Sequence, residues 1–198
     1  MDAWAVRSHQ RAAKAQAEGF FAGEILPIEA PQADGTVMSV DKDQAVRGET
    51  SLEELAQLKP AFKKDGQITA GVSSPLNAAG TGLMLMSKSK AKEKGIKPLA
   101  TIRAIAFVGL DPTIMGHGPV PASLKALDRL GMKPQDMDYW EINEAFAIVA
   151  LNCIKDLGLD PERVNVMGGG LAIGHPLGAT GNRLVGTLAR ILNLKGAR

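Results

Sequence analysis

The second half of the chain alternates between apolar runs of strand length and amphipathic runs of helix length. Strands are predicted at Leu99–Val108, Asp138–Ile142 and Arg163–Val166, and helices at Ala122–Leu130, Ala145–Leu157 and Asn182–Leu194. Such alternation is typical of βαβ units, which pair their strands in parallel and cover both faces of the sheet with helices. The pattern therefore predicts an α/β fold.

The first half of the chain is less regular. Asp2–Ala17 has helical spacing and ends before Gly19, and residues 25–67 resemble an insertion or lid in which Ser51 and Glu54 form a capping-box start for a short helix. Short extended pieces are expected at Glu24–Pro27 and Thr36–Val40, followed by an apolar run at Gly82–Met86 and a lysine-rich helix at Ser87–Gly95.

Composition narrows the class of protein. The 198 residues are 45% hydrophobic, and 23 basic and 21 acidic residues spread along the chain leave a net charge of +2, so no global field favours nucleic acid or a membrane surface. No apolar run reaches the roughly 18 residues of a transmembrane helix. One cysteine excludes an internal disulfide framework. The three histidines lack metal-ligand spacing, so no metal site is expected.

The glycine-rich segment Met167–Gly181 is the most informative part of the sequence, because glycines at this density let backbone approach a ligand or another segment closely. Two nucleotide-binding interpretations fail. A Walker-type loop beginning at Gly169 would need Lys and Ser or Thr where this chain has His175 and Pro176. A dinucleotide fingerprint fails because Ile173 occupies its third glycine position.

Two polar residues stand out at predicted turns. His175 lies between Gly174 and Pro176, on a rigid turn from which an imidazole can face a pocket, although a structural histidine is the alternative. Asn143 lies where the strand ending at Ile142 becomes a helix, the place where α/β sheets put ligand-contacting groups. Taken alone, Asn143 is equally an ordinary helix N-cap.

Together these segments resemble the thiolase family, whose members carry Asn-Glu-Ala-Phe, a glycine-rich Asn-x-x-Gly-Gly turn and Gly-His-Pro in this order. The matching segments here are Asn143–Phe146, Asn165–Gly169 and Gly174–Pro176. Further similarity covers essentially the whole chain, at Arg7–Ala12, Leu58–Phe62, Thr69–Gly71 and Asp111–Gly116.

The resemblance implies a layered α-β-α fold, a mixed and mostly parallel sheet with helices on both faces, incomplete at both ends. By the same resemblance, residues 1–75 are the C-terminal part of the loop or lid region. Residues 76–97 are the last strand and helix of the N-terminal thiolase core, and 98–198 are a truncated C-terminal thiolase domain.

The resemblance also implies an acyl-CoA acyltransferase that moves an acyl group between a 3-ketoacyl-CoA and CoA through a cysteine acyl-enzyme. His175 resembles the family's catalytic histidine, and Asn143 the residue that holds an ordered water of the oxyanion hole. Coenzyme A is a substrate here, and no resident cofactor is expected. The residues that resemble its binding positions are Ser74 at the pantetheine, Arg47 near the nucleotide, Ala70 as a backbone contact, and Phe146 and Met115 at the acyl pocket.

These binding positions also have ordinary structural interpretations, as a turn serine, a surface arginine and core side chains. Neither catalytic cysteine of the family has a counterpart, because one belongs before this sequence and the other to a Cys-x-Gly-Gly-Gly motif beyond Arg198. Cys153 is expected to be a buried, inert thiol in mid-helix. The chain alone is therefore expected to be inactive.

Two alternatives stay open beside a thiolase. A decarboxylating condensing enzyme is disfavoured, because such enzymes use two histidines where this chain has Asn143. A non-catalytic thiolase-like acyl-CoA-binding or scaffold protein is the main alternative. The expected partners are acyl-CoA and CoA, with a homodimer or homotetramer in the complete protein, no nucleic acid and no membrane span. The expected location is cytoplasmic, with an organellar location open.

Overall fold

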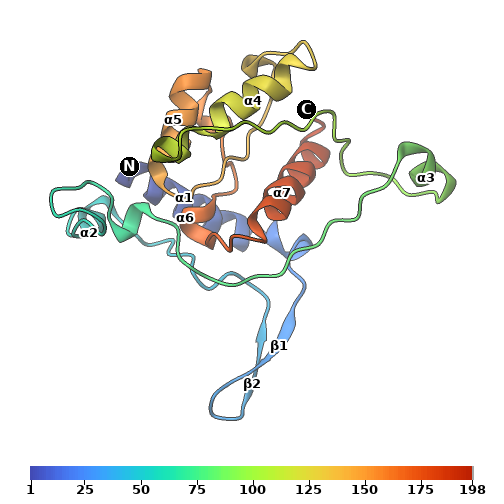
Figure 1. Cartoon of the computed structure of the whole chain (residues 1–198). Coiled ribbons are helices and arrows are strands. Elements are labelled where there is room, and N and C mark those ends of the chain that lie inside the picture. The colour runs from blue at the N-terminus through green and yellow to red at the C-terminus, as the bar shows by residue number, and fades with distance from the viewer. Residues whose placement is uncertain (198) are drawn as a thin grey trace.

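Helices form the body of the molecule in the computed structural model, which describes residues 1–197; Arg198, the last residue of the predicted domain 98–198, lies outside the described residues. The α-helices are α1 (Asp2–Ala17), α2 (Leu52–Leu55), α3 (Lys88–Glu93), α4 (Pro119–Asp128), α5 (Ala147–Leu157), α6 (Gly170–Ile173) and α7 (Thr180–Lys195). The 3-10 helices are η1 (Phe21–Gly23), η2 (Ala70–Val72), η3 (Pro112–His117), η4 (Pro134–Asp136) and η5 (Pro161–Arg163). Figure 1 shows α1, α5, α6 and α7 gathered together, with α2 and α3 at opposite ends of the molecule.

The predicted helix boundaries are close to the observed ones. α1 spans the predicted residues and is followed by Gly19 with a φ of 76°, a left-handed conformation that suits glycine. The predicted capping box is confirmed at α2, where the Ser51 hydroxyl accepts from the backbone of Glu54 and the Glu54 side chain accepts from the backbone of Ser51. Local patterning therefore determined these helices.

Small side chains on α1 allow the glycine-rich segment to approach it closely. Ala5, Ser8 and Ala12 are buried on one face of the helix. A Cβ atom at Gly168 would lie 2.6 Å from the Ser8 carbonyl oxygen and 2.7 Å from the Ala12 Cβ, and Gly168 has a φ of 81°. Only glycine fits this crossing, which brings α6 against α1.

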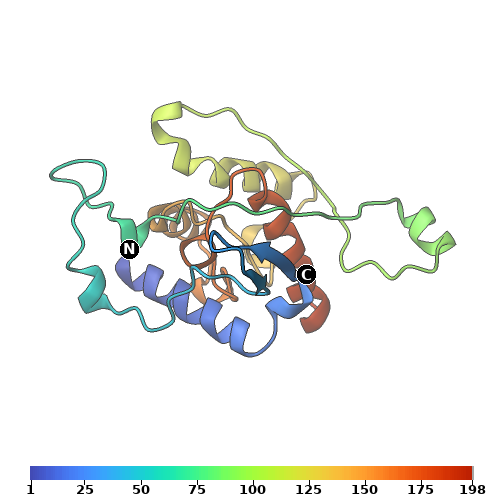
Figure 2. The ribbon, with the colours of Figure 1, turned by 90° about the horizontal axis from the view of Figure 1, so that it is seen from below.

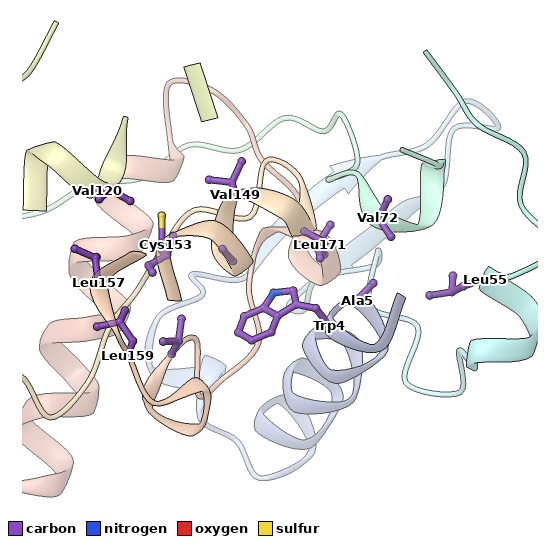
Figure 3. Close-up of a cluster of buried hydrophobic side chains, with 14 residues drawn as sticks. Trp4, Ala5, Leu55, Val72, Val120, Val149, Cys153, Leu157, Leu159 and Leu171 are labelled. Atoms are coloured by element: carbon purple, nitrogen blue, oxygen red, sulfur yellow. The ribbon is translucent and has the colours of Figure 1, made fainter. Parts of the chain in front are cut away.

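The hydrophobic core lies where α1, α5 and α6 meet. Figure 3 shows side chains from these helices around Trp4, including Cys153 of α5 and Leu171 of α6, with Val72 of η2 at one side. Trp4, Val72, Cys153 and Leu171 are all buried. The core therefore joins the first residues of the chain to residues about 150 positions later, and the candidate site is built on its edge.

A buried carboxylate ties the same elements together. Glu144 is fully buried and lies three residues before the first residue of α5. Its Oε1 atom accepts hydrogen bonds from Trp4 Nε1 at 2.9 Å and Asn165 Nδ2 at 2.8 Å. Its Oε2 atom accepts from Ser8 Oγ at 2.6 Å and from the backbone N–H of Leu171 at 3.2 Å. Four donors thus offset the loss of hydration of the buried carboxylate.

The prediction of a strand at Leu99–Val108 is wrong, because the structure forms no strand there. These residues form an extended connection between α3 and η3 without a backbone partner (Figure 1), and Phe107 is 83% exposed. The apolar run Gly82–Met86, predicted as the last strand of the first core, is likewise extended and lies outside any sheet. An apolar run becomes a strand only when neighbouring strands satisfy its N–H and C=O groups.

Among residues 1–197, parallel pairing between predicted strands is limited to one bridge, and a second parallel bridge joins Val166 to Gly168 within the glycine-rich turn. Trp140 pairs with Val164, and the N–H of Trp140 and that of Asn165 close the bridge at 2.9 Å each. The one sheet among residues 1–197 is the antiparallel hairpin of β1 (Ile28–Pro31) and β2 (Val37–Val40), which pairs Ile28 with Val40. Its second strand was predicted, whereas the first begins four residues after the predicted Glu24. The hairpin extends away from the helices and points toward the viewer in Figure 2.

Over residues 1–197, no helix combines the length and the apolarity that crossing a bilayer requires.

We predict that Glu144→Gln lowers the free energy of unfolding by about 2 to 4 kcal/mol, measured by urea denaturation. The amide NH₂ group would face two donors in either orientation, leaving buried N–H groups unpaired. Glu162→Gln is the control, because Glu162 is 73% exposed in its ion pair with Arg11 and its loss should cost less than about 1 kcal/mol. Equal effects of the two substitutions would contradict the central role of Glu144.

Candidate active site

The turn that carries His175 is clamped from a distant part of the chain. α6 ends at Ile173, whose carbonyl oxygen accepts from Asn77 Nδ2 at 3.0 Å. Gly174 follows with a φ of 93°, and any Cβ there would clash with the Asn77 side chain. The backbone N–H of His175 donates to the Pro75 carbonyl oxygen at 3.3 Å. The loop at residues 75–77 thus fixes the backbone position of His175.

The hydrogen bonds around the imidazole favour one tautomer. The Thr180 hydroxyl lies 3.0 Å from the Pro176 carbonyl oxygen and 2.8 Å from His175 Nδ1, and when it donates to the carbonyl oxygen it accepts from Nδ1. In that arrangement Nδ1 is the protonated nitrogen of the neutral ring. His175 Nε2 is then the acceptor, and Asn143 Nδ2 donates to it at 3.2 Å. The two predicted catalytic residues are in direct contact, with the basic nitrogen of the imidazole between them.

Asn143 is held by a second asparagine. The side chain of the fully buried Asn165 accepts from the N–H of Ile142 at 2.8 Å and donates to the Ile142 carbonyl oxygen at 2.9 Å. Helix α5 begins only at Ala147, with Phe146 as its N-cap, so the interpretation of Asn143 as an N-cap is wrong. Asn143 Oδ1 is buried and has no hydrogen-bond partner among the described residues.

Ser74 and Phe146 lie beside this pair. Ser73 forms a bridge with Phe146, and the N–H and hydroxyl of Ser74 both donate to the Ala145 carbonyl oxygen, at 3.0 and 3.1 Å. The exposed Phe62 ring packs edge-on against Phe146, with centroids 5.7 Å apart. Phe62 had been noted only as part of a family segment, and its aromatic partner is evident only in the fold. The two rings thus form an aromatic pair at the start of α5, three residues after Asn143.

The other predicted binding residues lie farther from the pair. The N–H of Arg47 donates to His9 Nδ1 at 3.1 Å, and its neighbour Val46 packs against the end of α6. Burial, and then the charge of Arg47, lower the pKa of His9. Ala70 is exposed in η2, and Met115 is 74% exposed in η3. Among the described residues, none of these makes a hydrogen bond to His175 or Asn143.

The single cysteine is unsuited to nucleophilic chemistry. Cys153 is fully buried in the middle of α5. Burial, and then the negative charge of Asp156, raise the pKa of its thiol to about 11, so the thiolate is scarce at neutral pH. The predicted burial of this thiol is confirmed.

A buried acidic residue lies behind the site. The Glu141 side chain is 2% exposed, and its Oε2 accepts from Arg183 Nη1 on α7 at 3.0 Å. Burial raises the pKa of Glu141 to about 8, and Arg183 opposes that shift while the nearby Glu144 and Glu24 add to it. Burial outweighs the single cation, because the desolvation cost of a carboxylate exceeds what one partner returns. Sequence reasoning missed this residue, whose only signal was its place two positions before Asn143.

Comparison with known proteins agrees with the geometry. The family model for the thiolase N-terminal domain matches residues 1–89, and that for the thiolase C-terminal domain matches residues 96–198. Two solved structures superpose on the chain: the Bacillus anthracis acetyl-CoA acetyltransferase (TM-score 0.91, 43% identity, 99% of this chain and 50% of that one) and human mitochondrial 3-ketoacyl-CoA thiolase (TM-score 0.89, 37% identity, 100% and 49%). The fold is thus the thiolase-like α/β fold that the resemblance implied.

The chain belongs to the thiolase family. The 3-ketoacyl-CoA thiolase of Marinobacter nauticus is 47% identical over 201 residues, which cover 100% of this chain and 51% of that protein. The 3-ketoacyl-CoA thiolase of Vibrio parahaemolyticus is 48% identical, again over 100% of this chain and 51% of that protein. The chain spans about half the length of these curated relatives.

We predict that Glu141 makes the chain less stable as pH rises. Its folded pKa is raised, so its contribution is fully present below the unfolded value of 4.5 and is lost as pH rises through about 8. The loss is at most about 1.4 kcal/mol per pH unit in this window. Urea unfolding at several pH values between 5 and 8 should show a smaller slope for Glu141→Gln than for the wild type. An unchanged slope would refute the assignment, and Glu162→Gln, on the surface, should keep the wild-type slope.

Proposed function

We propose that this chain supplies the oxyanion-binding half of a thiolase active site, in an enzyme that transfers acyl groups between a 3-ketoacyl-CoA and CoA. The observation that carries the proposal is the 3.2 Å contact between His175 Nε2 and Asn143 Nδ2, with Thr180 fixing the opposite side of the ring. Polar groups that the fold already holds close together stabilise charge on a thioester oxygen with less reorganisation than mobile water requires.

The proposed chemistry uses the histidine in two ways. Once the Asn143 N–H has left its lone pair, His175 Nε2 takes the proton of a cysteine thiol, and the resulting thiolate attacks the 3-keto carbonyl carbon. The protonated Nε2 then becomes a donor to the oxygen on which negative charge develops. Cleavage of the C2–C3 bond leaves the acyl group on sulfur and an acetyl-CoA enolate, which takes its proton from a second cysteine. The thiolate of the second cysteine takes the proton of the CoA thiol, the CoA sulfur attacks the acyl-enzyme carbonyl, and the released cysteine sulfur regains its proton from His175, which ends the cycle.

Both cysteines would come from outside this chain, because Cys153 is buried and has a raised pKa. Asn143 would contribute through its buried amide, whose Oδ1 is free to accept from a water molecule that completes the oxyanion hole. Donors of this kind typically contribute about 3 to 4 kcal/mol of transition-state stabilisation.

The substrate side of the proposal rests on neighbouring surfaces. Ser74 precedes Pro75, which accepts from the His175 backbone, and Phe146 lies three residues after Asn143, so both are proposed to contact the substrate, at the pantetheine and the acyl chain. Arg47, Ala70 and Met115 are retained as binding positions on the family resemblance alone. Acyl-CoA and CoA are the proposed partners, with no resident cofactor and no nucleic acid. A homodimer or homotetramer in the cytoplasm is the proposed state of the complete protein.

The second candidate is a non-catalytic thiolase-like protein that binds acyl-CoA or acts as a scaffold. Reading the coding DNA on either side of the chain separates the two functions. Both cysteine motifs in one reading frame support the enzyme, whereas a frame that lacks them supports the scaffold.

In the complete protein, we predict that His175→Ala lowers the turnover of acetoacetyl-CoA thiolysis at least about a hundredfold, because the acid/base group is lost. His117→Ala is the matched control, since His117 faces Asp156 at 3.3 Å on the surface and should leave turnover unchanged. Near-normal thiolysis by the His175 variant would reject its catalytic role.

We also predict that the 198-residue chain alone does not cleave acetoacetyl-CoA, because its one thiol is buried and protonated at neutral pH. The measurement is a thiolysis assay of the purified chain with excess CoA. Turnover that persists in Cys153→Ala would contradict the proposed division of the active site.

A further inference from the structure

Two hydrogen-bonded links join the segment before α5 to the start of α7. The first link runs from Asn143 through His175 to Thr180, with contacts of 3.2 and 2.8 Å. The second link is the 3.0 Å contact between Glu141 and Arg183. Residues two apart in extended chain point to the same side, and residues three apart share a helix face. The two links are therefore neighbours.

The first link does not hold α7 in place by itself. The turn from Pro176 to Ala179 contains Gly178 and the 80% exposed Leu177, and α7 begins without a side-chain cap. One hydroxyl, that of Thr180, connects the imidazole to the helix. A shift of α7 along its axis would move Thr180, and the imidazole with it, relative to Asn143.

The second link has the burial needed to resist such a shift. The Glu141 side chain is 2% exposed and that of Arg183 is 16% exposed. Glu141 Oε2 can accept from Arg183 whether the acid is ionised or protonated, because a carbonyl oxygen is present in both forms. The other carboxylates that act on the two residues are Glu24, Asp43 and Glu144.

We propose that Glu141 and Arg183 are positioning residues, which set the distance between Asn143 and His175 by fixing α7 against the segment that carries the asparagine. The catalytic consequence rests on the proposed thiolase function, whereas the geometric consequence does not. Neither residue touches the reacting atoms in the proposed mechanism, and both act through Thr180 and the backbone of residues 141–143.

The chain offers a matched control on the same helix. Arg190 lies seven residues after Arg183, on the same face of α7, and contacts Glu24 at 3.2 Å and the Phe20 carbonyl oxygen at 3.1 Å. It is similarly buried but far along the helix from Thr180. A general loss of helix packing would follow from the loss of either arginine, whereas a positioning role belongs only to Arg183.

The experiment compares Arg183→Met with Arg190→Met in the 198-residue chain by ¹⁵N NMR of histidine-labelled protein, with circular dichroism to verify folding. In the wild type at a pH where the ring is neutral, His175 should show one tautomer, with a protonated Nδ1 and a bare Nε2. Arg183→Met should convert this signature to a mixture of tautomers, and Arg190→Met should retain it. A wild-type signature in Arg183→Met, or an equal change in both variants, overturns the proposal.

Glu141 provides a second pair of variants if Arg183→Met does not fold. Glu141→Gln keeps an oxygen that accepts from Arg183 and should retain the single tautomer, whereas Glu141→Leu removes the acceptor and should lose it. The opposite order, or no difference between the two, overturns the proposal.

Kinetics of the complete protein give the catalytic readout. Arg183→Met should lower kcat about tenfold to a hundredfold, because misplacement of a reacting group by about 1 Å has effects of this size, with KM for CoA changed less than about twofold. A change in KM alone would contradict positioning. Should His175→Ala leave turnover normal while the tautomer result holds, the proposed function falls and the geometric inference stands.

Discussion

The buried carboxylate of Glu144 is the interaction on which the rest of the structure depends. It accepts from α1 through Trp4 and Ser8, from Asn165, and from the backbone of α6. A carboxylate without water is tolerated only when donors surround it, so these segments must converge on one point. Asn143 precedes Glu144 in the chain, and its position near α6 follows from that convergence.

The glycine-rich segment allows these segments to approach Glu144 closely. A Cβ at Gly169 would lie 2.5 Å from the Glu144 carboxylate, and one at Gly168 would press on the backbone of α1. The glycines therefore admit a carboxylate and a helix, which explains their density without any phosphate. Gly174 also forms the turn that ends α6. After this turn, the ring of His175 contacts Asn143.

The candidate site was only partly accessible to sequence reasoning. Family resemblance identified His175 and Asn143, and the structure brings them into contact. Thr180 and Phe62 were not assigned roles, because their meaning lies in partners that only the folded chain supplies. Thr180 reads in the sequence as an ordinary residue at a helix start, and only the fold places its hydroxyl between the Pro176 carbonyl oxygen and His175 Nδ1.

Sequence alone determined the helices, since α1, α5 and α7 follow from apolar spacing and the cap of α2 from Ser51 and Glu54. These signals are local, because a helix satisfies its backbone within itself. Tertiary structure alone decided that Leu99–Val108 is not a strand and that residues 32 positions apart form the site. A strand needs neighbouring strands for its hydrogen bonds, and a site needs distant segments to converge. No single local segment of the sequence specifies either of these long-range contacts.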